Sequence, residues 1–189
     1  MPADSLAEQH VRAFARACVR AGLLSTEQIH AEVVQAITDE LPERADQAET
    51  LAGSWVDEAR EQLRLEQTSW PEGTDYERLQ SAFEEMQLLD VDVLQGCEDH
   101  WAAKRLLDER ATAGAVPRGV LWFTAPDVWH AVDEGMLEVN LWHGTTANAA
   151  PGDELLDDVL GVLEKHGLAA RFDEGRIEVD AHWHKRIAP

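Results

Sequence analysis

Four side chains that can bind a metal ion alternate along one short stretch near the C-terminus. Glu178, Asp180, His182 and His184 are spaced two residues apart, and residues at this spacing on a β-strand share one face. Two histidines placed in this way can share one Zn²⁺, which takes nitrogen ligands at about 2.0–2.1 Å. The stretch therefore allows a zinc site built on His182 and His184.

A zinc site here also needs ligands from other segments. The candidates are His143, at the end of another predicted strand, and Cys97 with His100, in the run QGCEDHWAA. Cys97 and His100 also have the composition of a cysteine–histidine nucleophile pair. We favour a structural alternative for this run, in which Cys97 closes a strand, Asp99 caps the following helix and His100 faces solvent.

The other half of the C-terminal stretch is apolar. Ile177, Val179, Ala181 and Trp183 occupy the opposite side of the predicted strand, a pattern typical of a strand with one side in the core. On this interpretation the polar residues form the solvated face of an ordinary strand, and no cofactor is needed. We favour this interpretation and keep the zinc site as the alternative.

Trp142 is the candidate for contact with a partner protein. It falls on the polar side of a predicted strand, next to Glu138 and Asn140. An exposed tryptophan is a frequent anchor of protein interfaces. If helices cover both sides of the sheet, Trp142 is instead a buried packing residue, and both possibilities stay open.

Charge restricts the classes of partner. The net charge is −21, whereas nucleic acids and anionic membranes attract proteins rich in Lys and Arg. We therefore expect neither as a partner. The sequence also contains no P-loop, GxGxxG, GxSxG or HExxH motif, so it lacks the common nucleotide-binding and hydrolase signatures.

The location expected from the sequence is the cytoplasm. The first residues lack a basic region followed by an apolar run, which a signal peptide requires. No apolar stretch approaches the length of a membrane span.

Helical periodicity dominates the first third of the chain. Apolar residues recur at helical spacing in residues 6–21 and again between Ser25 and Pro42, where Ser25 and Gln28 can form a capping box. A third helix carries apolar residues at four-residue steps from Leu51 to Leu63. These patterns predict three N-terminal helices.

Strands and helices alternate farther along the chain. After a helix capped by Thr74, the expected strands are 91–95, 119–124, 136–143 and a final hairpin, with longer helices at about 98–112 and 153–166. This order of strands and helices along the sequence matches a ferredoxin-like βαββαβ sheet with one extra strand. The prediction is an α+β protein: a helical segment at 1–68 packed on a ferredoxin-like domain at 74–189. The short break between them also allows one cooperative unit.

The run SWPEGTDYERLQSAF carries a family resemblance. Its Trp-Pro, Thr-Asp, Arg-Leu and Ala-Phe pairs resemble a bacterial, mainly actinobacterial, domain-of-unknown-function family, number 6891. The runs ACVRAGLLSTEQI, RGVLWFTAPDVWHAV and ELLDDVLGVLEKHGL extend the resemblance over nearly the whole chain. It supports the α+β architecture and implies no activity.

The chain departs from this family at its cysteines. The resemblance implies a Cys-Cys-x-x-Cys-Gly cluster after the strand at 91–95, where Cys97 is the one possible counterpart, and a further cysteine where Tyr76 stands. The resemblance therefore does not extend to this chain the thiolate metal or redox role that such a cluster suggests. The expected function is a non-enzymatic module that binds another protein; the alternative is a metal-binding protein or small metalloenzyme that uses His182 and His184.

Overall fold

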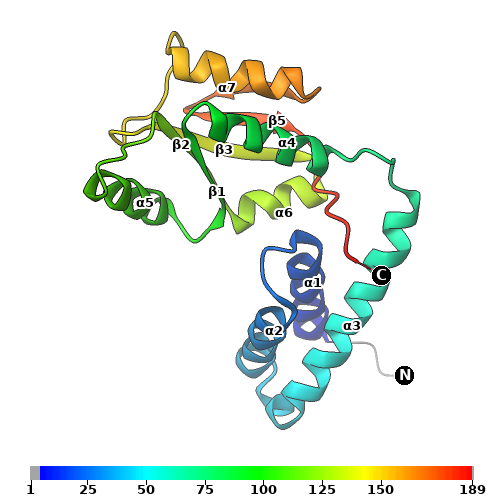
Figure 1. Ribbon diagram of the computed structural model, residues 1–189. Helices are drawn as coiled ribbons and strands as arrows, with labels where there is room; N and C mark the ends of the chain where they lie inside the picture. Colours follow the sequence, from blue (N-terminus) through cyan, green and yellow to red (C-terminus); the bar gives the residue numbers. More distant parts are fainter. Residues whose placement is uncertain (1–4, 189) are drawn as a thin grey trace. The chain divides into compact units, whose positions relative to one another are not determined.

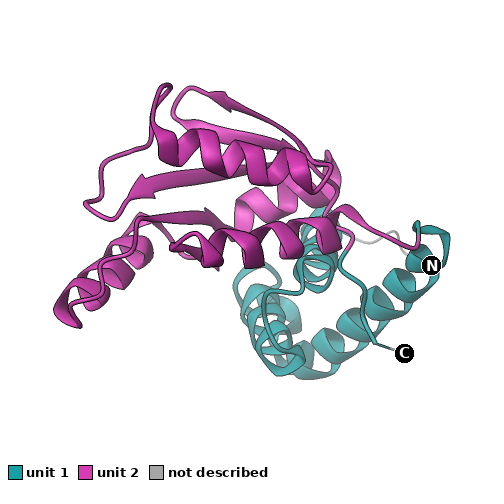
Figure 2. Cartoon of the chain, turned by 45° about the horizontal axis from the view of Figure 1, so that its top comes forward, with its two compact units in different colours: residues 1–71, 185–189 teal, residues 72–184 magenta. Residues whose placement is uncertain are grey.

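The chain divides into two compact units in the computed structural model, which describes residues 5–188. The first unit holds the described residues up to Pro71 and those from Lys185 onward, and the second runs from Glu72 to His184 (Figure 2). The chain thus passes between the units twice. Among the described residues, no helix combines the length and the apolar character needed to cross a bilayer.

The first unit is a group of three helices around one apolar core. Val11, Ile37 and Trp55, one from each helix, are buried within it, as the helical spacing of the sequence predicts. The helices are α1 (Leu6–Ala21), α2 (Thr26–Glu40) and α3 (Ala48–Glu66), with 3₁₀ turns η1 (Pro42–Gln47) and η2 (Gln67–Ser69).

Local signals set the ends of these helices. The predicted capping box of α2 is confirmed: the Ser25 hydroxyl accepts from the Gln28 amide at 3.2 Å, and the Gln28 side chain accepts from the Ser25 amide at 2.9 Å. Pro42 follows the end of α2, because the residue before a proline avoids helical dihedrals. Gly22 ends α1 with a φ of 57°, in the left-handed region that suits glycine.

The second unit is built on a five-stranded mixed sheet in the order β1-β2-β3-β5-β4 (Figure 1). β1 and β2 are parallel, and the other neighbouring pairs are antiparallel. The strands are β1 (Val91–Cys97), β2 (Gly119–Thr124), β3 (Met136–His143), β4 (Ala169–Asp173) and β5 (Arg176–Asp180); the helices are α4 (Asp75–Leu88), α5 (His100–Thr112), α6 (Ala125–Asp133) and α7 (Glu154–Lys165).

This order confirms an α+β fold but does not confirm the ferredoxin-like topology. Ferredoxin-like sheets use a split βαβ unit, in which another strand lies between the two parallel strands that a helix connects. Here β1 and β2 are direct neighbours connected through α5. The succession of elements along the sequence matched the prediction, but the lateral order of the strands depends on long-range pairing.

The two faces of the sheet are covered differently. Phe123 packs against Phe83 of α4, and Gly119, on the same face of β2, lies against Leu155 of α7. On the other face Trp122 packs in a smaller cluster with Leu107 of α5. Residues of β2 alternate between the faces, so this buried strand has apolar side chains on both sides.

An ion-pair group connects α4 to the end of α7. Lys165 Nζ donates to Glu85 at 2.7 and 2.8 Å, and His166 Nε2 lies 2.9 Å from Glu85 Oε2. The hydrogen bonds from Lys165 and then His166 lower the pKa of Glu85 below its ordinary value. A lowered carboxyl pKa contributes stability above the unfolded-state pKa of about 4.3, and this contribution is lost as pH falls through the folded-state value.

We expect Glu85→Gln to weaken the acid dependence of stability. The free energy of unfolding of the unmodified chain should exceed that of the variant at pH 5, and the difference should shrink as pH falls toward 3. Urea unfolding at several pH values measures this difference. Glu84→Gln changes an exposed neighbour on α4 and should give no such pH-dependent difference; equal profiles for the two variants would contradict the assignment.

Candidate functional site

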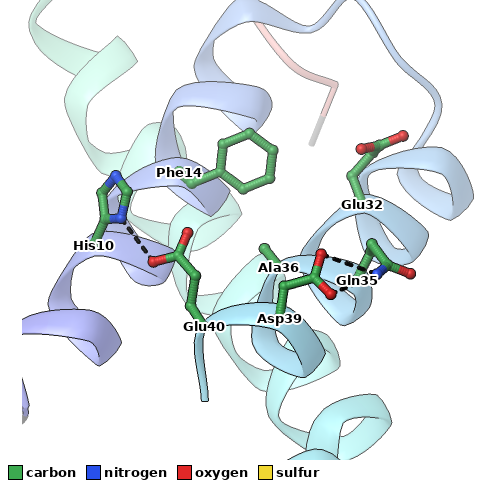
Figure 3. A pocket seen from close by; sticks show the side chains of 7 residues that line it. All are labelled: His10, Phe14, Glu32, Gln35, Ala36, Asp39 and Glu40. Carbon is green, nitrogen blue, oxygen red and sulfur yellow. Dashed lines mark hydrogen bonds and ion pairs between the residues drawn. The ribbon is translucent and has the colours of Figure 1, made fainter. Parts of the chain in front are cut away.

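A groove of about 280 Å³ lies between α1 and α2 in the first unit. Figure 3 shows its side chains, with Phe14 of α1 facing the acidic residues of α2. The lining residues are His10 and Phe14 from α1, and Glu32, Gln35, Ala36, Asp39 and Glu40 from α2.

Helical spacing brings these residues together. His10 and Phe14 are four positions apart, so they lie one above the other on α1. The lining positions of α2 follow one another at intervals of three, one, three and one residues, which is one stripe along a helix. This stripe lies beside the apolar stripe that contains Val33 and Ile37, so packing of the core positions the groove.

The electrostatics of the groove are strongly negative. Glu32, Asp39 and Glu40 contribute three carboxyl groups, and the lining residues include no lysine or arginine. His10 Nδ1 lies 2.8 Å from Glu40 Oε2, while Gln35 Nε2 donates to both oxygens of Asp39 at 2.9 and 3.0 Å. Hydrogen bonds therefore fix two of the three carboxylates in place.

The negative charge of Glu32 also acts on the thiol of Cys18. Burial, and then the negative charge of Glu32, raise the pKa of Cys18 to about 11. Cys18 is therefore a neutral core residue at physiological pH and not a thiolate nucleophile.

The chemistry of this groove favours a cation with an aliphatic stem. Phe14 and Ala36 supply apolar surface, and an aromatic face attracts a guanidinium or ammonium group. Lysine and arginine side chains combine an apolar stem with a charged end. The groove thus suits a basic side chain better than an anion or an uncharged apolar ligand.

The structure brings His182 and His184 together, but as a stack. Their rings have centroids 5.2 Å apart and planes that differ by 8°. Nitrogen lone pairs lie in the ring plane, so two nearly parallel stacked rings do not direct them at one ion 2.0–2.1 Å away. His182 also packs over Gly135, where an added Cβ would lie 2.7 Å from its Nδ1.

The carboxylates of the same stretch have other partners. Glu178 pairs with Arg171 of β4, and Asp180 Oδ1 lies 3.8 Å from the same guanidinium. Glu138 on β3 pairs with Arg176 at 2.6 Å. Such cross-strand ion pairs stabilise neighbouring strands of a sheet.

The remaining predicted ligands are dispersed. His143 lies at the end of β3 opposite the one near His182, because Asp180 pairs with Met136. Its Nε2 contacts Asp153 Oδ2 at 3.0 Å and lowers the pKa of that carboxyl. Within residues 5–188, no three His, Cys, Asp or Glu residues lie within reach of a single metal ion.

The run around Cys97 adopts the structural alternative. Cys97 closes β1 and its Sγ donates to the Phe123 carbonyl at 3.4 Å, while burial raises the pKa of the thiol. Asp99 caps α5 by accepting from the Trp101 amide at 2.9 Å. The His100 ring contacts Trp101, with ring centroids 4.7 Å apart.

Trp142 is half-buried and packs within its own unit. Its ring meets Trp122 edge-to-face, with centroids 5.1 Å apart, and its backbone forms a bridge with Asn148. The Trp122 Nε1 group is buried and has no hydrogen-bond partner among the described residues. The edge-to-face contact gives Trp142 a packing role against Trp122.

The groove between α1 and α2 was not predicted from the sequence. The feature of the sequence that indicates this groove is a stripe of acidic residues at positions 32, 39 and 40, beside the apolar stripe of the same helix. Recognising the groove also requires knowing which face of α1 packs next to that stripe.

Comparison with known families covers both units. The family described as a domain of unknown function (DUF6891) matches residues 4–187. The chain belongs to this family. The resemblance expected from the sequence is thereby confirmed, and the DUF6891 match includes the groove, the sheet and the stacked histidines. No curated protein and no solved structure matches the chain.

Proposed function

We propose that this DUF6891 protein is a non-enzymatic, cytoplasmic protein-interaction module that binds a basic segment of another protein. A lysine or arginine of the partner enters the groove between α1 and α2. There it lies over Phe14 and pairs with one carboxylate of α2, Glu32 or Asp39, which are two helical turns apart. The observation that carries the proposal is this aromatic groove, which is lined by three carboxylates and by no lysine or arginine.

The charge of the whole chain supports a basic protein partner. With a net charge of −21, the protein attracts cationic surfaces at long range and repels nucleic acids and anionic membranes. Such attraction raises the rate of encounter, whereas the groove supplies the specific contact. No cofactor or metal takes part in this function.

An arginine-containing peptide tests the proposal. The probe is a Gly-Ser decapeptide that contains two arginines, and its control contains glutamine at both positions. We expect the arginine peptide alone to shift the amide NMR signals of α1 and α2 in the full ¹⁵N-labelled chain. In E32Q/D39N its affinity should fall about tenfold, since two charges leave the groove.

A matched variant separates the groove from general acidity. E43Q/D46N removes the same number of charges from η1, outside the groove, and should change the affinity less than twofold. Phe14→Leu keeps an apolar side chain but removes the aromatic face, and should weaken binding severalfold. Equal losses in the two double variants, or shifts spread over all acidic surfaces, would overturn the proposal.

A further inference from the structure

The two edges of the sheet in the second unit differ in regularity. β1 forms one edge, and its pairing with β2 shifts register between Leu94 and Cys97, where Gly96 has a φ of 62°. Such a bulge disturbs an edge and hinders pairing with another strand. β4 forms the other edge and pairs with β5 without a break over all five of its residues, Ala169–Asp173. The outward backbone groups of β4 therefore follow a regular strand pattern.

A groove of about 500 Å³ runs beside this regular edge. One wall is α7, through Leu160 and Glu164, and the other is the start of β4, through Ala169 and Ala170. The two alanines and the neighbouring Gly167 leave room beside the strand. A helix next to an exposed strand edge is a geometry that accepts an extended peptide, whose backbone pairs with the edge and whose side chains enter the groove.

The lining of this groove selects the chemistry of its occupant. Leu160 and the alanines present apolar surface, and Glu164 is the one charged residue among the lining side chains. Asp173 and Glu174 add negative charge at the far end of β4, and the guanidinium of Arg171, in the middle of the strand, is paired with Glu178 of β5. The second unit also contains about two-thirds of the acidic residues of the chain but only half of its basic ones. An extended segment with an apolar and a basic residue two positions apart, and thus on the same side of the added strand, complements this surface.

We infer that the edge of β4 and the groove beside α7 bind an extended, lysine-containing protein segment as an added β-strand. Its backbone pairs with β4, an apolar side chain packs against Leu160, and a lysine pairs with Glu164. This second site is separate from the groove between α1 and α2, and it selects a conformation of the partner as well as its charge.

The probe is a capped six-residue peptide, Thr-Val-Thr-Lys-Thr-Val, whose valines and lysine are two positions apart and therefore lie on one side of the added strand. Its control has the same side chains but carries N-methyl groups on alternate residues, which removes the backbone donors of one edge. Binding is measured by NMR on the full chain carrying E32Q/D39N, so that the first groove contributes little. We expect the unmethylated peptide to shift and protect the amides of β4, and the methylated peptide to bind at least tenfold more weakly.

Two charge reversals test the pairing with Glu164. Glu164→Lys places a cation near the C-terminal end of α7, where the helix dipole favours it, so the variant should fold and bind the peptide about tenfold more weakly. Glu84→Lys makes the same change at an exposed position of α4, outside the groove, and should bind within twofold of the parent. Equal binding of the methylated and unmethylated peptides, no shift at β4, or equal losses in both reversals would overturn the inference. Each of these outcomes leaves the α1–α2 groove to be judged by its own peptide.

Discussion

Replacing Trp183 by alanine should lower the free energy of unfolding of the second unit by about 3–5 kcal/mol, the usual cost of deleting a buried tryptophan side chain. Trp183 is 3% exposed. Its ring makes edge-to-face contacts with Tyr76 at 4.9 Å and with Phe123 at 5.9 Å between centroids. The deletion therefore removes contacts with both α4 and β2 and leaves a cavity between them.

An exposed tryptophan in the same unit provides the control. Trp101 is 54% exposed at the start of α5, so Trp101→Ala makes the same chemical change with less than half the loss of burial and opens no cavity in the core. We expect a change below about 1 kcal/mol for this variant. Urea unfolding followed by far-ultraviolet circular dichroism compares the two variants. Similar destabilisation by both would contradict the packing role assigned to Trp183.

The burial of Trp183 was readable from the sequence because period-two alternation is a local signal. Ile177, Val179, Ala181 and Trp183 are all buried, as predicted. The alternation continues past the end of β5 at Asp180, because the Ala181 amide donates to Gly135 and the Trp183 amide donates to Ala131. The apolar half of the stretch therefore follows the strand pattern farther than the strand itself does.

The arrangement of the polar half depended on contacts that local alternation does not specify. His182 lies beyond the last residue of β5, and the imidazole rings stack on one another instead of pointing at a common centre. His143 could complete a metal site with His182 and His184 only if the pairing of β3 with β5 placed it near them. The observed register places His143 at the opposite end of β3. A sequence shows which residues can bind a metal ion and how they are spaced along the chain. Whether their side chains meet at one point depends on how neighbouring strands pair.

Strand order and the acidic groove were missed for a related reason. The expected helices and strands were found where the apolar pattern placed them, since each pattern is contained within one element. The neighbours of β2 and the helix opposite Phe14 are determined by packing between elements distant in sequence. The family resemblance supplied the architecture class and nothing about either of these contacts.

Replacing Glu8 by alanine should lower the free energy of unfolding of the first unit by about 2–3 kcal/mol. Glu8 is a buried charged residue, 9% exposed, in a unit whose core is otherwise apolar. Its Oε2 accepts from Arg44 Nη1 at 2.7 Å, and its Oε1 accepts from Arg12 Nη2 at 3.2 Å. The carboxylate thus joins α1 to η1, and its removal leaves two guanidinium groups without this partner.

The size of this effect depends on how far the two arginines can reach water. Arg12 and Arg44 side chains are 28% and 31% exposed, so partial solvation keeps the expected loss below that of a fully buried pair. Glu58 also pairs with Arg12, at 2.9 Å, but its side chain is 67% exposed. Glu58→Ala should therefore cost less than about 1 kcal/mol. Urea unfolding of both variants separates the two cases, because a cost at Glu8 no larger than at Glu58 would show that burial of the carboxylate adds nothing to the ion pair.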